Sequence, residues 1–307
     1  MLHITEQQVL DAMTMAKAIE LVDSSFQQLA AGTAVNHPRR RVILPTGSIL
    51  HYMAAGNSEY FGTKVYSSNP KTGAHFIFLL YRSADGLPIA QIEANHMGQI
   101  RTGAASGVAT KYLARPDADV LGVIGSGFQA ETQIAAMATV RKLREIRVWS
   151  RKQDRREAFA SHCAGKFGLH VRAAETAREA VEGAGIVVTA TNAKEPVLEA
   201  AWISPGTHIN AMGSNWTIRR ELPTDLVLDR ADLVTVDSIE DAHLESGDLM
   251  IPLQERPDAA FPAIEFCDVA AGRHPGRTSP AQITIFKSNG LAIQDVLSAG
   301  YLYERYS

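Results

Sequence analysis

Hydrophobic and polar positions change their spacing along the chain. Near the N-terminus they follow a helical period: residues 5–8 fit a capping box, and residues 15–31 place four apolar side chains on one face. From residue 36 to residue 94 the period shortens to that of strands. The segments predicted to be strands are 41–44, 48–53, 62–68, 75–81 and 88–93. Turn residues between them indicate hairpins, and therefore an antiparallel sheet.

The rest of the chain alternates strands with helices. A helix of small residues beginning at Arg101 leads to a boundary at 114–117. The predicted strands beyond it are 119–124, 145–150, 169–173, 185–190, 206–211 and 232–237, and the predicted helices are 128–141, 153–166, 176–182 and 222–230. This alternation predicts an α/β fold with a doubly wound parallel sheet of the Rossmann type at 114–286. We expect 1–113 plus 287–307 to form a discontinuous α+β domain with the antiparallel sheet, because the last helix should return to it.

The turn after the strand at 119–124 has the composition of a dinucleotide site. Gly125-Ser126-Gly127-Phe128-Gln129-Ala130 fits the pattern G-x-G-x-x-[G/A] between a strand and a helix. The first glycine permits a tight turn, the second lets a pyrophosphate approach the backbone, and Ala130 keeps the helix close to the strand. The N-terminus of the helix offers free N–H groups to phosphate. An ordinary strand-to-helix turn is the alternative.

The next strand in this domain indicates which cofactor is preferred. NAD-binding folds usually place an acidic residue near its end, where the side chain accepts a hydrogen bond from the ribose 2′-OH. This strand instead ends in Ser150, Arg151 and Lys152, with Arg155 and Arg156 one turn later. Cations bind a 2′-phosphate, so NADP(H) is favoured over NAD(H); a solvated basic helix start is the alternative. Small and amide residues after two later strands, Thr191 and the run Asn210–Asn215, suit a nicotinamide ring.

Four cations in the first domain stand in places where cations are rare. Lys64 lies in an apolar strand, Arg101 lies among small residues, and Arg39 and Arg41 alternate along one strand. Together they resemble a carboxylate clamp, since arginine binds a carboxylate with two hydrogen bonds and lysine can transfer a proton. The alternative for each is a structural ion pair, with Glu59 or Glu93 as the partner.

Composition excludes several other classes. A net charge of −3 argues against a general nucleic-acid or membrane binder, and no apolar run reaches the length of a membrane span. The chain has only two cysteines, and its histidines do not show the spacing of metal ligands. We therefore expect neither a disulfide framework nor a metal site. No signal peptide is evident, so we expect a cytoplasmic protein.

Ordered motifs along nearly the whole chain resemble the ornithine cyclodeaminase and mu-crystallin family. The matching segments are Gly62–Lys64, Arg101–Ala104, Val123–Ala130, Val148–Arg151, Ile209–Gly213, Val236–Ser238, Glu245–Asp248 and Thr284–Ala292. The resemblance implies a homodimer with a Rossmann domain beside a substrate and dimerisation domain. It also implies that Lys64, Arg101 and an early arginine hold the substrate carboxylate. Arg39 and Arg41 both fit that arginine, and the Pro38-Arg39 pair favours Arg39.

The resemblance completes the predicted site. The predicted cofactor-binding residues are Thr102, Gly125, Ser126, Gly127, Phe128, Gln129, Ala130, Ser150, Arg151, Lys152, Thr191, Met212 and Gly213. The predicted catalytic residues are Lys64, Arg101 and Asn215. Similar cyclodeaminases carry an acid/base aspartate at the position of Asn215, and an amide cannot transfer protons at neutral pH.

The asparagine therefore favours reduction of a preformed imine over deamination. The leading hypothesis is NAD(P)H-dependent reduction of a cyclic 2-imino acid, either pyrroline-2-carboxylate to proline or piperideine-2-carboxylate to pipecolate. The alternatives are a cyclodeaminase acting on ornithine or a related diamino acid, an alanine or other amino-acid dehydrogenase, and a binding protein of the mu-crystallin kind. We expect a small amino or imino acid, and no nucleic acid or membrane, as the partner.

Overall fold

Two sheets organise the chain, which a computed structural model describes over residues 1–307. The chain divides into two compact units. The first unit contains Met1–Ala104 and Gly290–Ser307, and the second contains Ala105–Asn289. Helix α3 (Asn95–Leu113) runs from the one into the other. None of the helices is both long and apolar enough to cross a membrane.

The first unit is built on a six-stranded sheet with the order β1-β6-β5-β4-β3-β2. Its strands are β1 (Leu2–Ile4), β2 (Val35–Ile43), β3 (Ile49–Gly56), β4 (Tyr60–Asn69), β5 (Gly73–Arg82) and β6 (Pro88–Glu93). Its other helices are α1 (Glu6–Ala12), α2 (Met15–Ala30) and α10 (Ala292–Tyr306). The predicted antiparallel pairing is confirmed for β2 to β6, but β1 joins β6 in parallel. A three-residue strand is too short for its period to be recognised in the sequence.

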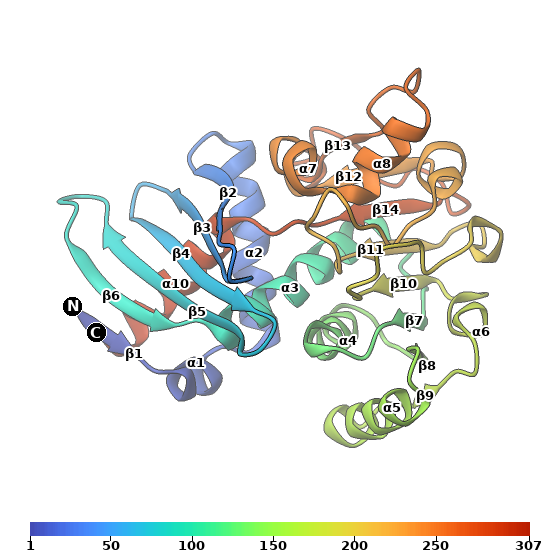
Figure 1. Cartoon of the computed structure of the whole chain (residues 1–307), viewed down its shortest axis with the longest axis horizontal. Helices are drawn as coiled ribbons and strands as arrows, with labels where there is room; N and C mark the ends of the chain where they lie inside the picture. The colour runs from blue at the N-terminus through green and yellow to red at the C-terminus, as the bar shows by residue number, and fades with distance from the viewer. The chain divides into compact units, whose positions relative to one another are not determined.

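Helix α10 packs against strands β2 to β5 and against α2 (Figure 1). Alternation along the strands divides the side chains between the two faces of the sheet. Met53, Lys64 and Phe78 are paired across β3, β4 and β5 and are buried. Tyr52, Val65 and Ile77 are paired one residue along and belong to the opposite face, where Tyr52 and Ile77 are exposed.

The second unit is built on an eight-stranded sheet with the order β13-β12-β14-β11-β10-β7-β8-β9, and every neighbouring pair is parallel. Its strands are β7 (Val120–Ile124), β8 (Glu145–Trp149), β9 (Val171–Ala173), β10 (Ile186–Thr189), β11 (His208–Ala211), β12 (Leu233–Val236), β13 (Ala263–Glu265) and β14 (Thr284–Lys287). Its helices are α4 (Phe128–Val140), α5 (Gln153–Phe167), α6 (Ala177–Val181), α7 (Ile239–Glu245), α8 (Gly247–Glu255) and α9 (Phe266–Ala270), with the short helical turns η1 (Ala200–Trp202) and η2 (Leu226–Arg230). The predicted doubly wound parallel sheet is confirmed.

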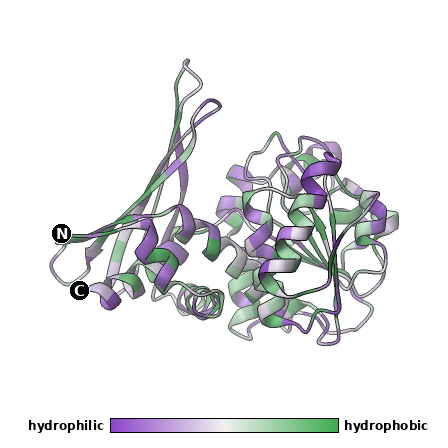
Figure 2. Cartoon of the chain, turned by 90° about the horizontal axis from the view of Figure 1, so that it is seen from below, coloured by the Kyte–Doolittle hydropathy of each residue, from purple (hydrophilic) through white to green (hydrophobic).

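Apolar strands form the interior of this unit (Figure 2). Residues of β7, β10, β11 and β14 form one buried cluster with residues of α6, η2, α7 and α8. The strand order reverses between β7 and β10, since β8 and β9 extend to one side and β10 and β11 to the other. In sheets of this kind, ligands bind at the carboxyl ends of the strands at that reversal.

Two predicted elements differ from the structure, and one central strand was not predicted. Helix α3 begins at Asn95 and not at Arg101, because the Glu6 carboxylate accepts hydrogen bonds from the backbone N–H groups of Asn95 and His96. The helix predicted at 222–230 is only the turn η2. The segment before the last helix contains β14, which inserts between β11 and β12 and was not predicted as a strand.

Candidate functional site

The turn from β7 to α4 has the backbone that a pyrophosphate requires. Gly125 has a φ of +120°, and a Cβ there would lie 2.4 Å from the carbonyl oxygen of Ala190. Gly127 is the N-cap of α4 and makes no side-chain capping hydrogen bond. No atom lies within 4 Å of a Cβ placed on Gly127. The N-terminus of α4 and the open space above Gly127 fit a dinucleotide, while buried Ala130 keeps α4 on the sheet.

The ends of β7 and β8 are joined by a hydrogen bond between the hydroxyls of Ser126 and Ser150, whose oxygens are 2.9 Å apart. Arg151, Lys152 and Arg155 are exposed beyond β8. Arg156, in contrast, is buried and donates to the carbonyl of Ser150 and the carboxylate of Glu175. Arg156 therefore has a structural role. The other three cations after β8 are available to bind the 2′-phosphate of a cofactor.

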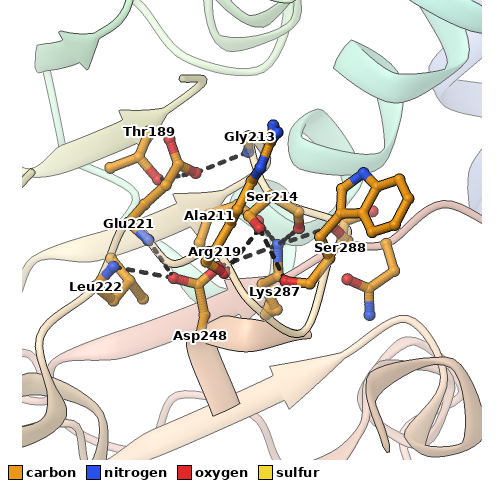
Figure 3. Close-up of polar contacts among 12 residues, drawn as sticks. Thr189, Ala211, Gly213, Ser214, Arg219, Glu221, Leu222, Asp248, Lys287 and Ser288 are labelled. Atoms are coloured by element: carbon orange, nitrogen blue, oxygen red, sulfur yellow. Dashed lines mark hydrogen bonds and ion pairs between the residues drawn. The ribbon is translucent and has the colours of Figure 1, made fainter. Parts of the chain in front are cut away.

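A buried carboxylate, Glu221, joins the carboxyl ends of β10 and β11 (Figure 3). It accepts hydrogen bonds from the Thr189 hydroxyl at 2.9 Å and from the Thr191 and Gly213 N–H groups at 2.7 Å. Burial and the neighbouring Asp248 carboxylate raise the pKa of Glu221. Gly213 admits no side chain, since its Cβ would lie 2.2 Å from the carbonyl oxygen of Thr191.

Lys287 and Asp248 extend this network (Figure 3). Lys287 Nζ donates to the carbonyls of Ala211, Ser214 and Ser288. Asp248 accepts from the Glu221 N–H at 2.6 Å and from the Leu222 N–H at 2.9 Å. These contacts fix both ends of the loop 212–221, which carries Asn215.

The sequence reasoning missed Glu221, Asp248 and Lys287 as parts of the site. Lys287 carried a usable signal, because it is a lysine at the end of Ile283-Thr-Ile-Phe286, a short segment rich in strand-forming residues. Glu221 gave none, since no regular period surrounds it. Among the predicted residues here, Met212 is buried, and Thr191 and Asn215 are partly exposed. Phe128 is 61% exposed at the start of α4.

In the first unit, Lys64 is 2% exposed on the helix-covered face of the sheet. Its Nζ lies 2.9 Å from Oδ1 of Asp295, on the first turn of α10. Gly98 of α3 makes room for it, because a Cβ there would lie 2.7 Å from Nζ. The Phe76 ring centroid lies 5.3 Å from the same nitrogen.

Arg101 reaches the same carboxylate. Its Nε lies 3.3 Å from Oδ1 of Asp295, and its Nη1 donates to Oε1 of Gln294 at 3.3 Å. Gly290, with a φ of +87°, passes so close that a Cβ would lie 2.7 Å from Nη1. The alternative pairing with Glu59 or Glu93 is wrong for Lys64 and Arg101, since both pair with Asp295.

Arg39 and Arg41 differ in burial. Arg39 is 5% exposed and lies at a β-bulge between His37 and Arg40, with Nη2 3.7 Å from the sulfur of Met53. Arg41 is only partly buried. Arg39 therefore lies on the face that holds Lys64, and it adds to the positive potential there.

His51 of β3 contacts two residues of the neighbouring strand β4. Its ring stacks on Tyr66 at a centroid distance of 4.2 Å, and Nε2 lies 2.9 Å from the Ser68 hydroxyl. Burial, with the charges of Arg41 and Arg39, lowers its pKa to about 4. The imidazole is therefore neutral near pH 7.

The buried charges at Asp295 do not balance. Lys64 and Arg101 bring two positive charges to this one carboxylate, and all three side chains are buried. Burial lowers the pKa of Lys64 to about 8, while Asp295 opposes that shift and Arg101 and Arg39 add to it. Buried charge in excess requires an anionic partner, so the cluster is suited to the carboxylate of a small acid.

Thr102 is the one predicted cofactor-binding residue in the first unit. It lies on α3, in the first unit, and its hydroxyl donates to the carbonyl of Gly98 at 2.8 Å. The glycine turn, the β8 end and the Glu221 network all lie in the second unit. Each unit thus carries one half of the predicted chemistry.

Comparisons with known proteins agree over the full chain. The model of the ornithine cyclodeaminase/mu-crystallin family matches residues 2–307. A Delta(1)-pyrroline-2-carboxylate reductase of Bacillus cereus is 34% identical, covering 99% of this chain and 96% of that protein. The structure of the Thermococcus litoralis Delta(1)-pyrroline-2-carboxylate reductase, in complex with NADH and L-proline, is 36% identical with a TM-score of 0.94, covering 99% and 97% of the two chains. An archaeal alanine dehydrogenase dimer with bound NAD is 31% identical with a TM-score of 0.92, covering 99% and 95%.

Proposed function

Because the chain belongs to the ornithine cyclodeaminase/mu-crystallin family, we propose that it reduces a cyclic 2-imino acid with a nicotinamide dinucleotide. Pyrroline-2-carboxylate is the leading substrate, and piperideine-2-carboxylate is the second. The observation that carries the proposal is that two buried cations, Lys64 and Arg101, share the single carboxylate of Asp295. The relatives whose printed activity is pyrroline-2-carboxylate reduction support the same substrate class.

The chain's own residues then have separate roles. Arg101 and Arg39 bind the carboxylate and fix the orientation of the ring. Lys64, with a pKa of about 8, holds a proton for the imine nitrogen at neutral pH. The reduced nicotinamide, when bound, supplies the hydride that the imine carbon takes up. One hydride and one proton convert the C=N bond to the CH–NH of the cyclic amino acid.

Asn215 supports reduction over deamination. A neutral amide does not take a proton from an amine at pH 7, so loss of ammonia from ornithine lacks an acid/base group there. Reduction needs only the proton on nitrogen, and Lys64 or a substrate already in the iminium form provides it. The Asn215→Asp variant should therefore gain ammonia release from ornithine, and no gain would contradict this account of Asn215.

The direct test is steady-state NADPH or NADH oxidation with pyrroline-2-carboxylate. We expect turnover with the imino acid, and neither net cofactor reduction with alanine nor ammonia release from ornithine. Brisk ammonia release from ornithine without turnover of the imino acid would favour the cyclodeaminase. Steady NADH formation with alanine would favour the dehydrogenase. If the cofactor raises the melting temperature and no imino acid does, the chain would be a binding protein.

The preference for the phosphorylated cofactor follows from the end of β8. Arg151, Lys152 and Arg155 are exposed there, and the residues that directly follow the strand include no carboxylate. Guanidinium and ammonium groups bind a 2′-phosphate, whereas a 2′-OH needs an acceptor. NADPH is therefore our proposed cofactor, although the neighbouring structures are described with NADH and NAD.

A homodimer is the proposed assembly. The face of the first sheet opposite α10 exposes Tyr52, Phe61 and Ile77. Exposed apolar side chains on the open face of a sheet are typical of an interface between subunits. A second copy of the chain, packed on this face, would bury them, and one neighbouring structure is described as a dimer.

A further inference from the structure

Asp295 forms ion pairs with both Lys64 and Arg101, and it is not among the predicted site residues. It is 0% exposed on the first turn of α10. One of its oxygens, Oδ1, accepts from Lys64 Nζ at 2.9 Å and from Arg101 Nε at 3.3 Å. A single oxygen thus sets the distance between the two cations that are proposed to hold the substrate.

The other side of Asp295 is closed. Its Oδ2 is buried and makes no hydrogen bond. Since Oδ1 bonds the two cations and Oδ2 is enclosed, the effect of Asp295 on the reaction passes through Lys64 and Arg101. Its neighbour Gln294, also 0% exposed, receives Arg101 Nη1 and keeps the guanidinium in the same orientation.

The α10 turn that carries these side chains is itself held in place. The N–H of Ile293 donates to Oδ1 of Asn36 at 3.2 Å. Gly290 then brings the backbone against Arg101, where any side chain would collide with the guanidinium. The position of Asp295 is therefore fixed by contacts on both β2 and α3.

The charges around Lys64 come from three elements. Arg39 of β2 and Arg101 of α3 disfavour its ammonium form, as does burial, and Asp295 of α10 alone favours it. The Phe76 ring of β5 contributes only a weak cation–π contact at 5.3 Å. A buried lysine without a counter-ion titrates near pH 5–6 and would carry no proton at pH 7.

We propose that Asp295 is a positioning residue that keeps Lys64 protonated and fixes it against Arg101 for the reduction. The kinetic part of this proposal rests on the proposed reductase function. The electrostatic part does not, because the protonation of Lys64 can be measured without a substrate.

The kinetic test is the Asp295→Asn variant, which keeps the shape of the side chain and removes its charge. The Lys64 pKa should fall by at least about one unit, since a charge within hydrogen-bond distance is lost in a buried site. If Lys64 donates the proton, kcat/KM then changes less than about twofold at pH 6 and falls about tenfold at pH 9, because the alkaline limb moves to lower pH. The control is Glu304→Gln, which removes an exposed carboxylate on the same helix. This variant should not shift the alkaline limb of the pH profile of kcat/KM.

If Asp295 had only a structural role, the Asp295→Asn variant would lower kcat/KM by the same factor at every pH. A folded Asp295→Asn variant whose pH profile of kcat/KM has its alkaline limb at the same pH as the wild type overturns the proposal. The second measurement uses the wild-type chain: the ¹³C-labelled lysine εCH₂ signal that is lost in Lys64→Met is titrated by NMR. A pKa near 8 supports the proposal, and a value near 5–6 overturns it even if Asp295→Asn does not fold. If the NMR titration succeeds but no imino acid is turned over, the proposed function fails and the charge relationship stands.

Discussion

Lys287 Nζ lies 3.3 Å from Oδ2 of Asp248, and neither side chain is exposed to solvent. The pair holds the segment between β11 and η2, since Asp248 accepts from the N–H groups of Glu221 and Leu222. The Lys287→Met variant would leave a buried carboxylate without its counter-ion. We expect it to lower the free energy of unfolding by about 3–5 kcal/mol, measured by urea denaturation.

An exposed pair in the same unit provides the control. Arg273 and Asp268 lie 2.9 Å apart with side chains 52% and 41% exposed. The Arg273→Met variant should lose no more than about 1 kcal/mol, because solvent screens the interaction. Equal losses in the two variants would show that the Lys287 pair does not hold this segment.

Variants of Lys64 and Arg101 should separate proton transfer from carboxylate binding. Lys64→Met should lower kcat with pyrroline-2-carboxylate by about 100-fold or more, the usual contribution of a positioned acid. Arg101→Gln should act mainly on KM, raising it about 10- to 100-fold, since it removes a charge-assisted hydrogen bond. Steady-state kinetics at pH 7 measure both. Lys71→Met, an exposed lysine, should change neither, and an unaltered kcat in Lys64→Met would contradict its role as proton donor.

His208 should make the protein less stable in acid. Its imidazole is 0% exposed and lies 2.9 Å from the Thr284 hydroxyl, and burial lowers its pKa from 6.5 to about 3. Between these values the unfolded chain binds a proton that the folded chain does not, so stability is lost as the pH falls below 6.5. His208 alone should lower the free energy of unfolding by about 3 kcal/mol at pH 4 relative to pH 7.

Urea denaturation of His208→Gln at both pH values tests this, and the variant should show a smaller difference than the wild type. His37→Gln, at an exposed histidine, should retain the full difference. A His208→Gln variant with an unchanged difference would mean that other groups cause the acid sensitivity.

The choice of cofactor should depend on the residues after β8. Replacing Arg151 and Lys152 with alanine removes two exposed cations, and we expect KM for NADPH to rise about tenfold or more while KM for NADH changes little. Lys142→Ala, an exposed lysine elsewhere in the second unit, is the matched control. A parallel rise in both KM values would mean that these side chains do not distinguish the cofactors.

The open face of the first sheet should carry the dimer contact. Ile77 is 44% exposed, and the Ile77→Lys variant should give a monomer in sedimentation or light scattering, because it places a charge in an apolar interface. Ile218→Lys, at a residue 72% exposed in the second unit, should leave the assembly unchanged. A dimeric Ile77→Lys variant would place the interface elsewhere.

Local chemistry explains what could be read from the sequence. The β7–α4 turn could be predicted because it depends on a few consecutive residues. Gly125 permits its backbone and Ala130 permits close packing of α4, and neither depends on residues distant in the sequence. Lys64 and Arg101 could be chosen as candidate site residues because cations rarely occur in apolar surroundings without an anionic partner. The alternation of strands and helices likewise follows from the period of short segments.

Contacts between residues that are far apart in the sequence could not be predicted from local patterns. Asp295 is 231 residues from Lys64, and no local pattern links the two. The start of α3 was misplaced for the same reason, since its capping carboxylate comes from Glu6. Strand β14 was missed because it joins the sheet between two strands that precede it in the chain.

The interrupted course of the chain has a consequence for biosynthesis. Ribosomes make the 185 residues of Ala105–Asn289 before they make the helix that contributes Asp295. The nascent first unit therefore waits, with two basic side chains still unneutralised, until α10 has emerged. We expect protease resistance to appear first in the nucleotide-binding portion, and in the N-terminal portion only after release of the complete polypeptide.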